Sequence, residues 1–303
     1  MRVNRRGFAL VELLTALVIT SMLGAALFRL VDRTQRFTRG TALMADQRAQ
    51  LAVAAFAVEA ALQGVAPSDG DVLVAADSSV SFLAPVGSAI ACALGGGFVD
   101  LASPVIASGA TLTWWNTAPQ AGDSIAILDD GSLAGAADDR WVHAEVTAIS
   151  ALPNACLHSP FLDSIADAGR VGWRLAASPA PPPTVTPGAV VRVGHPERFA
   201  LYRSAGEWMA GWTEWNPIAG RWNVIQPVAG PLLPYAAPGS TSGMSFRWRD
   251  SLGAVLSSAG PGNARVVEVS LGAVTRHAVR MDGAAGGMRR DSLTVRIPLR
   301  NLP

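Results

Sequence analysis

The feature of this chain most suggestive of chemistry is a single carboxylate, Glu12, near the start of a long apolar stretch. Together with residues 8–11, the apolar positions 13–28 give roughly the 20 residues that span the hydrocarbon core of a membrane. The only interruptions within 13–28 are Thr15, Thr20, Ser21 and Gly24. A charged side chain inside such a segment costs about 3 kcal/mol, so it normally has a partner and a function. We therefore expect Glu12 to neutralise a positive charge in apolar surroundings.

Gly7 and Phe8 precede this carboxylate at a spacing that resembles the class III signal of type IV pilins and type II secretion pseudopilins. The resemblance implies that a prepilin peptidase cuts after Gly7 and leaves Phe8 as an N-methylated amino terminus. It also implies that Glu12 compensates the terminal amine of a neighbouring subunit. The resemblance thus assigns processing to Gly7 and Phe8 and assembly to Glu12.

The residues that flank the apolar stretch predict its orientation. Residues 1–7 contain Arg2, Arg5 and Arg6 and no acid, which favours a cytoplasmic amino terminus. An ordinary secretory signal has its cleavage site after the apolar region, whereas Gly7 precedes it here. The sequence therefore predicts a single-pass inner-membrane protein with a periplasmic carboxyl-terminal domain. After assembly the whole protein would be part of a filament.

Composition argues against an enzyme. Half of the 303 residues are hydrophobic, and the formal net charge of +1 makes a nucleic-acid partner unlikely. All 24 basic residues are arginine, so no P-loop or Schiff-base lysine exists. The four histidines are scattered, and the paired aspartates at 129–130 and 138–139 read as turn residues. We expect no catalytic residues, no metal and no cofactor.

The distribution of proline divides the chain into a helical and a β-rich part. No proline precedes Pro67, and Leu51, Ala55, Val58 and Leu62 share one helical face. The sequence predicts a leader at 1–7, a membrane-spanning or filament-core helix at 8–30, its periplasmic continuation at 31–63 and a β-rich domain at 65–303. Gly40 is a candidate kink, and the proline-rich segment near residue 180 is a candidate subdivision of the β-rich part.

Apolar and polar residues alternate in the second part, which predicts antiparallel strands with one buried face. Pro298 places the last of these strands at a sheet edge. The predicted strands are 71–74, 80–83, 111–115, 124–128, 142–148, 190–193, 199–202, 244–248, 267–271 and 293–299. The expected fold is α+β, with the second half of a long N-terminal α-helix packed on a mostly antiparallel β-sheet.

Two further residue sets are candidate sites. Cys92 and Cys156 are the only cysteines, and an exported chain with an even number favours a disulfide between them. Trp208, Trp212, Trp215 and Trp222 form a cluster for which packing in the core is favoured. If exposed, the cluster would be a contact surface for subunits, sugars or bases.

Residues 47–62 and 292–301 look like the helix and closing strand of PilW-type minor pilins. This resemblance implies a structural subunit that primes or caps a type IV pilus. Its partners would be the prepilin peptidase, other pilin or pseudopilin subunits and the inner-membrane assembly platform. Two alternatives stay open: a J-type pseudopilin of a type II secretion system, because of residues 267–271, and a membrane-anchored sugar- or DNA-binding module.

Overall fold

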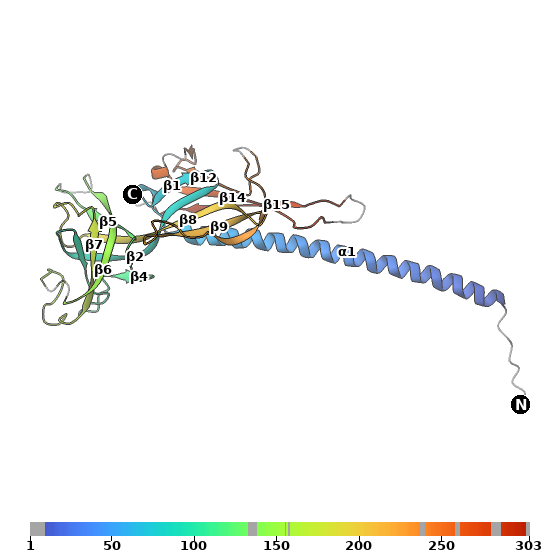
Figure 1. Ribbon diagram of the computed structural model, residues 1–303, viewed down its shortest axis with the longest axis horizontal. Coiled ribbons are helices and arrows are strands. Elements are labelled where there is room, and N and C mark those ends of the chain that lie inside the picture. Colours follow the sequence, from blue (N-terminus) through green and yellow to red (C-terminus); the bar gives the residue numbers. More distant parts are fainter. Residues whose placement is uncertain are drawn as a thin grey trace, which may run out of the picture.

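The computed structural model describes residues 10–132, 138–154, 156, 158–236, 240–257, 261–279 and 286–300. One long helix, α1 (Leu10–Leu62), projects from a β-rich head (Figure 1). Its 53 residues correspond to about 80 Å. The head contains antiparallel strands, and the second half of α1 packs on them. The predicted α+β fold is confirmed.

The helix is continuous through Gly40, where the sequence suggested a kink. Gly40 is instead the first buried residue of α1, so it marks where the head begins to cover the helix. At the other end, α1 stops at Leu62, and a 3-10 turn, η1 (Pro67–Asp69), follows. Gly64 fits this junction because a Cβ there would lie 3.1 Å from the ring of Pro85.

The strands of the described residues belong to one 15-stranded sheet, and a second 3-10 turn, η2 (Pro261–Asn263), precedes β14. The strands are β1 (Val72–Ala76), β2 (Ser79–Gly95), β3 (Phe98–Leu101), β4 (Trp114–Trp115), β5 (Ser124–Asp129), β6 (Arg140–Pro153), β7 (Val171–Ser178), β8 (Val190–Ser204), β9 (Glu207–Asn216), β10 (Arg221–Trp222), β11 (Gln226–Leu232), β12 (Met244–Arg249), β13 (Val255–Leu256), β14 (Val266–Val274) and β15 (Arg290–Pro298).

Each predicted strand falls within or overlaps an observed one, although several bounds differ. The segment 111–115 forms only the short β4, and 190–193 and 199–202 are parts of the single strand β8. Among the described residues β15 pairs only with β14, so Pro298 lies in an edge strand as predicted. The sequence analysis missed β3, β7, β9, β10, β11 and β13.

The two longest partners, β2 and β8, hold the head together. They pair antiparallel from Ser79 opposite Ala200 to Ile90 opposite Val190, with a register shift between Pro85 and Gly87. Their length lets one continuous ladder pass through two separate hydrophobic cores.

The first core lies between α1 and the sheet. Leu51, Ala55, Val58 and Leu62 are all buried there, which confirms the predicted helix face. They pack with side chains from β2, β8, β12 and β14, including the fully buried Trp248. Burying one Val or Leu side chain contributes about 1.5 to 3 kcal/mol, so this face is sufficient to hold the helix on the head.

Polar side chains on the same half of α1 complete hydrogen bonds at the sheet. The Gln47 amide is buried and donates to the Ala273 carbonyl oxygen at 2.8 Å. Gln50 accepts a hydrogen bond from the Gly230 backbone N–H at 3.2 Å. These contacts fix the rotation of the helix, because an apolar face alone would allow it to turn or slide.

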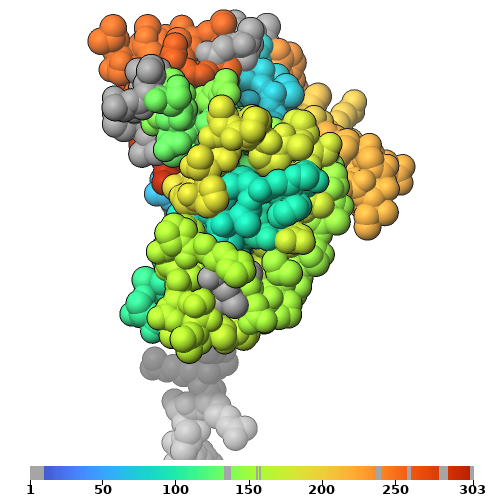
Figure 2. Space-filling view, turned by 90° about the vertical axis from the view of Figure 1, so that its left-hand side faces the viewer, coloured from blue at the N-terminus to red at the C-terminus, as the bar shows by residue number. Residues whose placement is uncertain are grey.

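The second core lies beyond the end of α1 and contains β3, β5, β6, β7 and the adjoining parts of β2 and β8. In Figure 1 these strands are at the end of the molecule opposite the amino terminus. Figure 2 faces that end and shows the teal residues around β2 and β3 surrounded by yellow-green residues of the later strands. The proline-rich segment 179–187 connects β7 to β8, and Val185 within it is buried in this core.

The predicted disulfide between Cys92 and Cys156 is formed, with their Cα atoms 5.2 Å apart. Cys92 lies in β2, and Cys156 follows the end of β6. The bridge closes a loop of 64 residues that includes much of the second core. It therefore restricts the unfolded chain in the region that has no helix to cover it.

We predict that replacing both cysteines by alanine lowers the free energy of unfolding by about 4 kcal/mol, from the loop-closure entropy of a 64-residue loop. Urea denaturation of the full-length protein in detergent measures the change. A reducing agent should lower the midpoint of the natural sequence and leave that of the double variant unchanged. Equal midpoints for the two proteins would contradict a stabilising bridge.

Candidate functional site

The first half of α1 is an exposed apolar surface. Its large hydrophobic side chains, from Leu10 to Phe37, are between 42 % and 82 % exposed in the isolated chain. By length and composition α1 is able to cross a membrane. Thr15 and Thr20 donate their hydroxyl hydrogens to the carbonyl oxygens of Val11 and Ala16, so these polar groups add little cost in an apolar environment.

The exposed stretch has one charged residue, Glu12, at its beginning and the charged residues Asp32 and Arg36 near its end. Glu12 lies in the first helical turn, where a carboxylate interacts favourably with the helix dipole. Gly7 and Phe8 lie outside the described residues, so cleavage between them stays a prediction. At the other end, Arg36 pairs with Asp32 one turn earlier, at 2.5 Å between Nη2 and Oδ2.

The four clustered tryptophans lie on two faces of the sheet. Trp208 and Trp212 of β9 pack against the core that α1 covers. Trp215 and Trp222 are on the opposite face, where their rings meet edge to face with centroids 5.5 Å apart. All four are half-buried, and they do not form one continuous aromatic platform.

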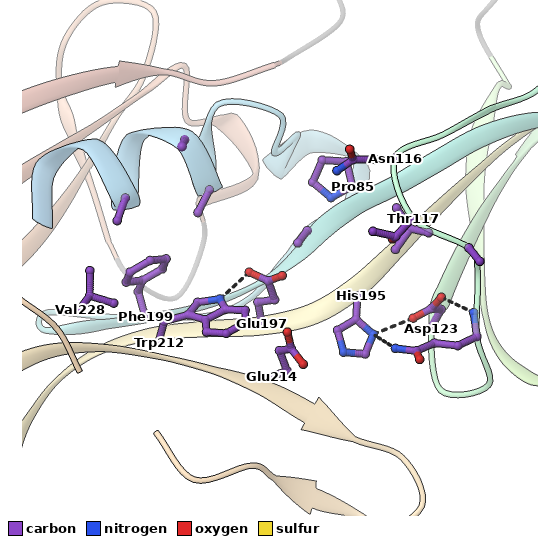
Figure 3. A pocket seen from close by; sticks show the side chains of 17 residues that line it. Pro85, Asn116, Thr117, Asp123, His195, Glu197, Phe199, Trp212, Glu214 and Val228 are labelled. Carbon is purple, nitrogen blue, oxygen red and sulfur yellow. Dashed lines mark hydrogen bonds and ion pairs between the residues drawn. The ribbon is translucent and has the colours of Figure 1, made fainter. Parts of the chain in front are cut away.

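A cleft of about 680 Å³ opens between α1 and the sheet, at the junction of the two cores (Figure 3). It forms where β8 changes its second neighbour: β5 pairs with β8 up to Gly194, and β9 pairs with it from Glu197. His195 and Pro196 lie in this gap. The missing N–H of Pro196 is tolerated there because β8 has no neighbour on that side.

His195 is held at one end of the cleft by a buried carboxylate. Its Nδ1 lies 2.6 Å from Oδ1 of Asp123, a residue with no exposed surface. Asp123 Oδ2 in turn accepts a hydrogen bond from the Gln120 backbone N–H at 2.7 Å. Gly122 allows this arrangement, because its φ is +90° and a Cβ would collide with Pro217.

Two further carboxylates lie beside this pair. Glu197 of β8 is directly opposite Glu214 of β9, and both line the cleft. The indole Nε1 of Trp212 donates a hydrogen bond to Glu197 Oε2 at 2.6 Å. On the opposite wall, α1 contributes the small side chains of Ala57, Ala60 and Ala61.

The environment raises the pKa of His195 and that of Glu197, which both lie on β8. The pKa of His195 lies above its usual 6.5, mainly because the Asp123 carboxylate hydrogen-bonds to the ring and favours the imidazolium. The nearby charges of Glu214 and Glu197 act in the same direction. Burial raises the pKa of Glu197, and the negative charge of Glu214 raises it further, against the hydrogen bond from Trp212.

Comparison with known protein families gives one finding, at the amino terminus. Residues 2–28 match the family model described as the prokaryotic N-terminal methylation motif. The match supports a type IV pilin-like protein. It covers Gly7, Phe8, Glu12 and the apolar residues that follow. No curated protein and no solved structure matches the chain.

The methylation motif was recognisable from the sequence, but the cleft was not. Asp123 and His195 are 72 residues apart, and nothing in the sequence indicates that they meet. One signal was present: His195, Glu197 and Phe199 alternate and share one face of β8. Gly194 and Pro196 interrupt the apolar pattern, so the sequence analysis divided β8 into two strands.

We predict that the stabilising effect of His195 depends on pH. Because its pKa in the folded protein lies above 6.5, its contribution is complete below that pH and is lost as the pH rises through the folded-state pKa. The melting temperature of His195→Gln should therefore fall further below that of the natural sequence at pH 6 than at pH 9.

The charged groups that act on His195 are Asp123, Glu197 and Glu214, all of them acids, and the neutral Gln120 amide also lies 3.4 Å from its Nδ1. His277→Gln is the control, because His277 is exposed and outside the cleft. The melting temperature of His195→Gln could instead lie below that of the natural sequence by the same amount at pH 6 and pH 9. That result would contradict the role of the Asp123–His195 pair.

Proposed function

We propose that this chain is a minor pilin-like structural subunit of a type IV pilus, which primes or caps the filament after processing by prepilin peptidase. The match of residues 2–28 to the N-terminal methylation motif carries the proposal. The exposed apolar half of α1 supports it, because such a surface requires either lipid or other helices around it.

The same surface provides a mechanism for assembly. In the inner membrane the first half of α1 is surrounded by lipid, and in a filament by the equivalent helices of other subunits. Glu12 then pairs with the Phe8 amine of a neighbour. The pair sets the axial register, because any other register leaves a charge unmatched in apolar surroundings.

The shape of the head favours a terminal position over one within the filament. The second core lies beyond the end of α1, away from the amino terminus (Figure 1). In a filament of parallel, axially stacked subunits, the head of the next subunit would occupy the space into which the second core extends. A subunit at the tip has no neighbour above it, which suits a priming or capping role better than that of a repeated subunit.

The distribution of aromatic side chains gives less support to a sugar- or DNA-binding module. A stacking platform needs several rings on one accessible face. Trp212 instead packs on the helix-covered core, while Trp215 and Trp222 meet edge to face on the opposite face. We therefore prefer the structural role.

We predict that Gly7→Ala blocks removal of the leader. The natural sequence, produced together with a prepilin peptidase, should begin at an N-methylated Phe8, as read by intact mass and amino-terminal sequencing of the membrane-bound protein. Gly24→Ala is a matched control, because a Cβ at Gly24 meets nothing within 4 Å. Mature protein from Gly7→Ala, or an unprocessed chain from the natural sequence, would refute the assignment.

We predict that Glu12→Ala leaves the protein processed and inserted in the membrane but reduces its incorporation into filaments. An unmatched amine in an apolar helix core costs about 3 to 5 kcal/mol. Immunoblotting of sheared filaments against membranes measures the ratio of assembled to membrane protein. Glu59→Ala, at an exposed acid of the same helix, should assemble normally. Equal incorporation of the two variants would exclude a register role for Glu12.

A further inference from the structure

The cleft between α1 and the sheet contains an unfavourable pair of like charges. Glu197 and Glu214 are direct partners across the β8–β9 ladder, where side chains on one face lie closest together. Like charges at such positions destabilise a sheet. The Trp212 indole binds one carboxylate oxygen of Glu197 through a neutral N–H, which leaves the negative charge in place. The fold therefore maintains the two acids together at a cost.

Among the described residues that line the cleft there is no arginine to neutralise these acids. Among the described lining residues the one basic side chain is His195, which lies beside the two glutamates but hydrogen-bonds to the buried Asp123. Arg198, the next residue after Glu197 in β8, points to the opposite face, with its guanidinium carbon 4.3 Å from the centroid of the Trp222 ring. Since α1 contributes only alanines and β11 only Val228, the cleft lining carries excess negative charge.

The remaining walls are apolar and partly aromatic, apart from the polar side chains of Asn116, Thr117 and Gln120. Phe199 and Trp212 line the same cleft, and Figure 3 shows the Trp212 ring beside the Glu197 carboxylate with the Phe199 ring next to Trp212. The hydrogen bond from Nε1 to Glu197 fixes the orientation of the Trp212 ring. Aromatic faces attract cations, and paired carboxylates match the fork of N–H donors in a guanidinium group. The volume of about 680 Å³ is typical of a small-ligand site.

We propose that this cleft binds an organic cation, a guanidinium or ammonium group on a short apolar stem, between Glu197 and Glu214 and against Trp212 and Phe199. The cation neutralises the like-charge pair, and its stem lies against the alanines of α1. An arginine side chain of another polypeptide and a free small cation share this chemistry. The inference does not depend on the amino-terminal signal, because none of its residues lies in the apolar half of α1.

The test is isothermal titration calorimetry of the full-length protein in detergent at pH 7.5, with ethylguanidinium as the probe and ethylurea as its uncharged match. We expect saturable binding of one ethylguanidinium, weakened by salt, and none of ethylurea. Glu214→Gln should weaken binding about tenfold or more, because charge-assisted hydrogen bonds contribute about 1.5 to 3 kcal/mol. Glu207→Gln, on the same strand but outside the cleft, should bind as the natural sequence does.

A blocked Gly-Arg-Gly peptide and its citrulline counterpart distinguish the two sources. Tighter binding of the arginine peptide than of ethylguanidinium indicates a polypeptide partner, and the reverse indicates a free cation. Glu214→Gln should keep or raise the melting temperature, since it removes the repulsion from Glu197. The proposal is overturned if neither cation binds, if the neutral analogues bind equally well, or if salt leaves the affinity of the natural sequence unchanged.

Discussion

The structure depends on one helix that must satisfy two different environments. The first half of α1 presents apolar side chains all round and needs lipid or other helices as its solvent. The second half confines its large buried residues to one face and packs that face on the sheet. Because the helix is continuous, the position of the head is coupled to that of the exposed apolar half.

A second constraint arises inside the head, where one strand serves two cores. β8 stays paired with β2 along its length while its other edge passes from β5 to β9. Between the end of β5 and the start of β9 no strand pairs with this edge of β8 in the described residues. His195 and the acids near it therefore line an opening. The Asp123–His195 contact spans this interval and links the loop before β5 to the strand that both cores share. The cleft is thus a consequence of sheet topology.

Local patterns were sufficient for much of the fold. The helix, its buried face and the edge position of Pro298 follow from periodicity and from the missing N–H of proline, which do not depend on distant residues. Prediction failed where tertiary contacts override local patterns. Gly40 does not interrupt α1, because the helix is continuous and begins to be covered by the head there. The strands rich in small or aromatic residues, such as β9 and β11, lack the alternation that identifies a strand.

The sequence by itself determined the long apolar helix and the methylation motif of the amino terminus, because both are properties of consecutive residues. The spacing of Gly7, Phe8 and Glu12 within this motif is set by their order along the chain alone. The disulfide was predictable because only two cysteines exist. Only the tertiary structure decided which acids meet His195 and which tryptophans share a face. Those contacts join residues far apart in the chain, and their proximity is set by strand register and helix packing, which no local pattern encodes.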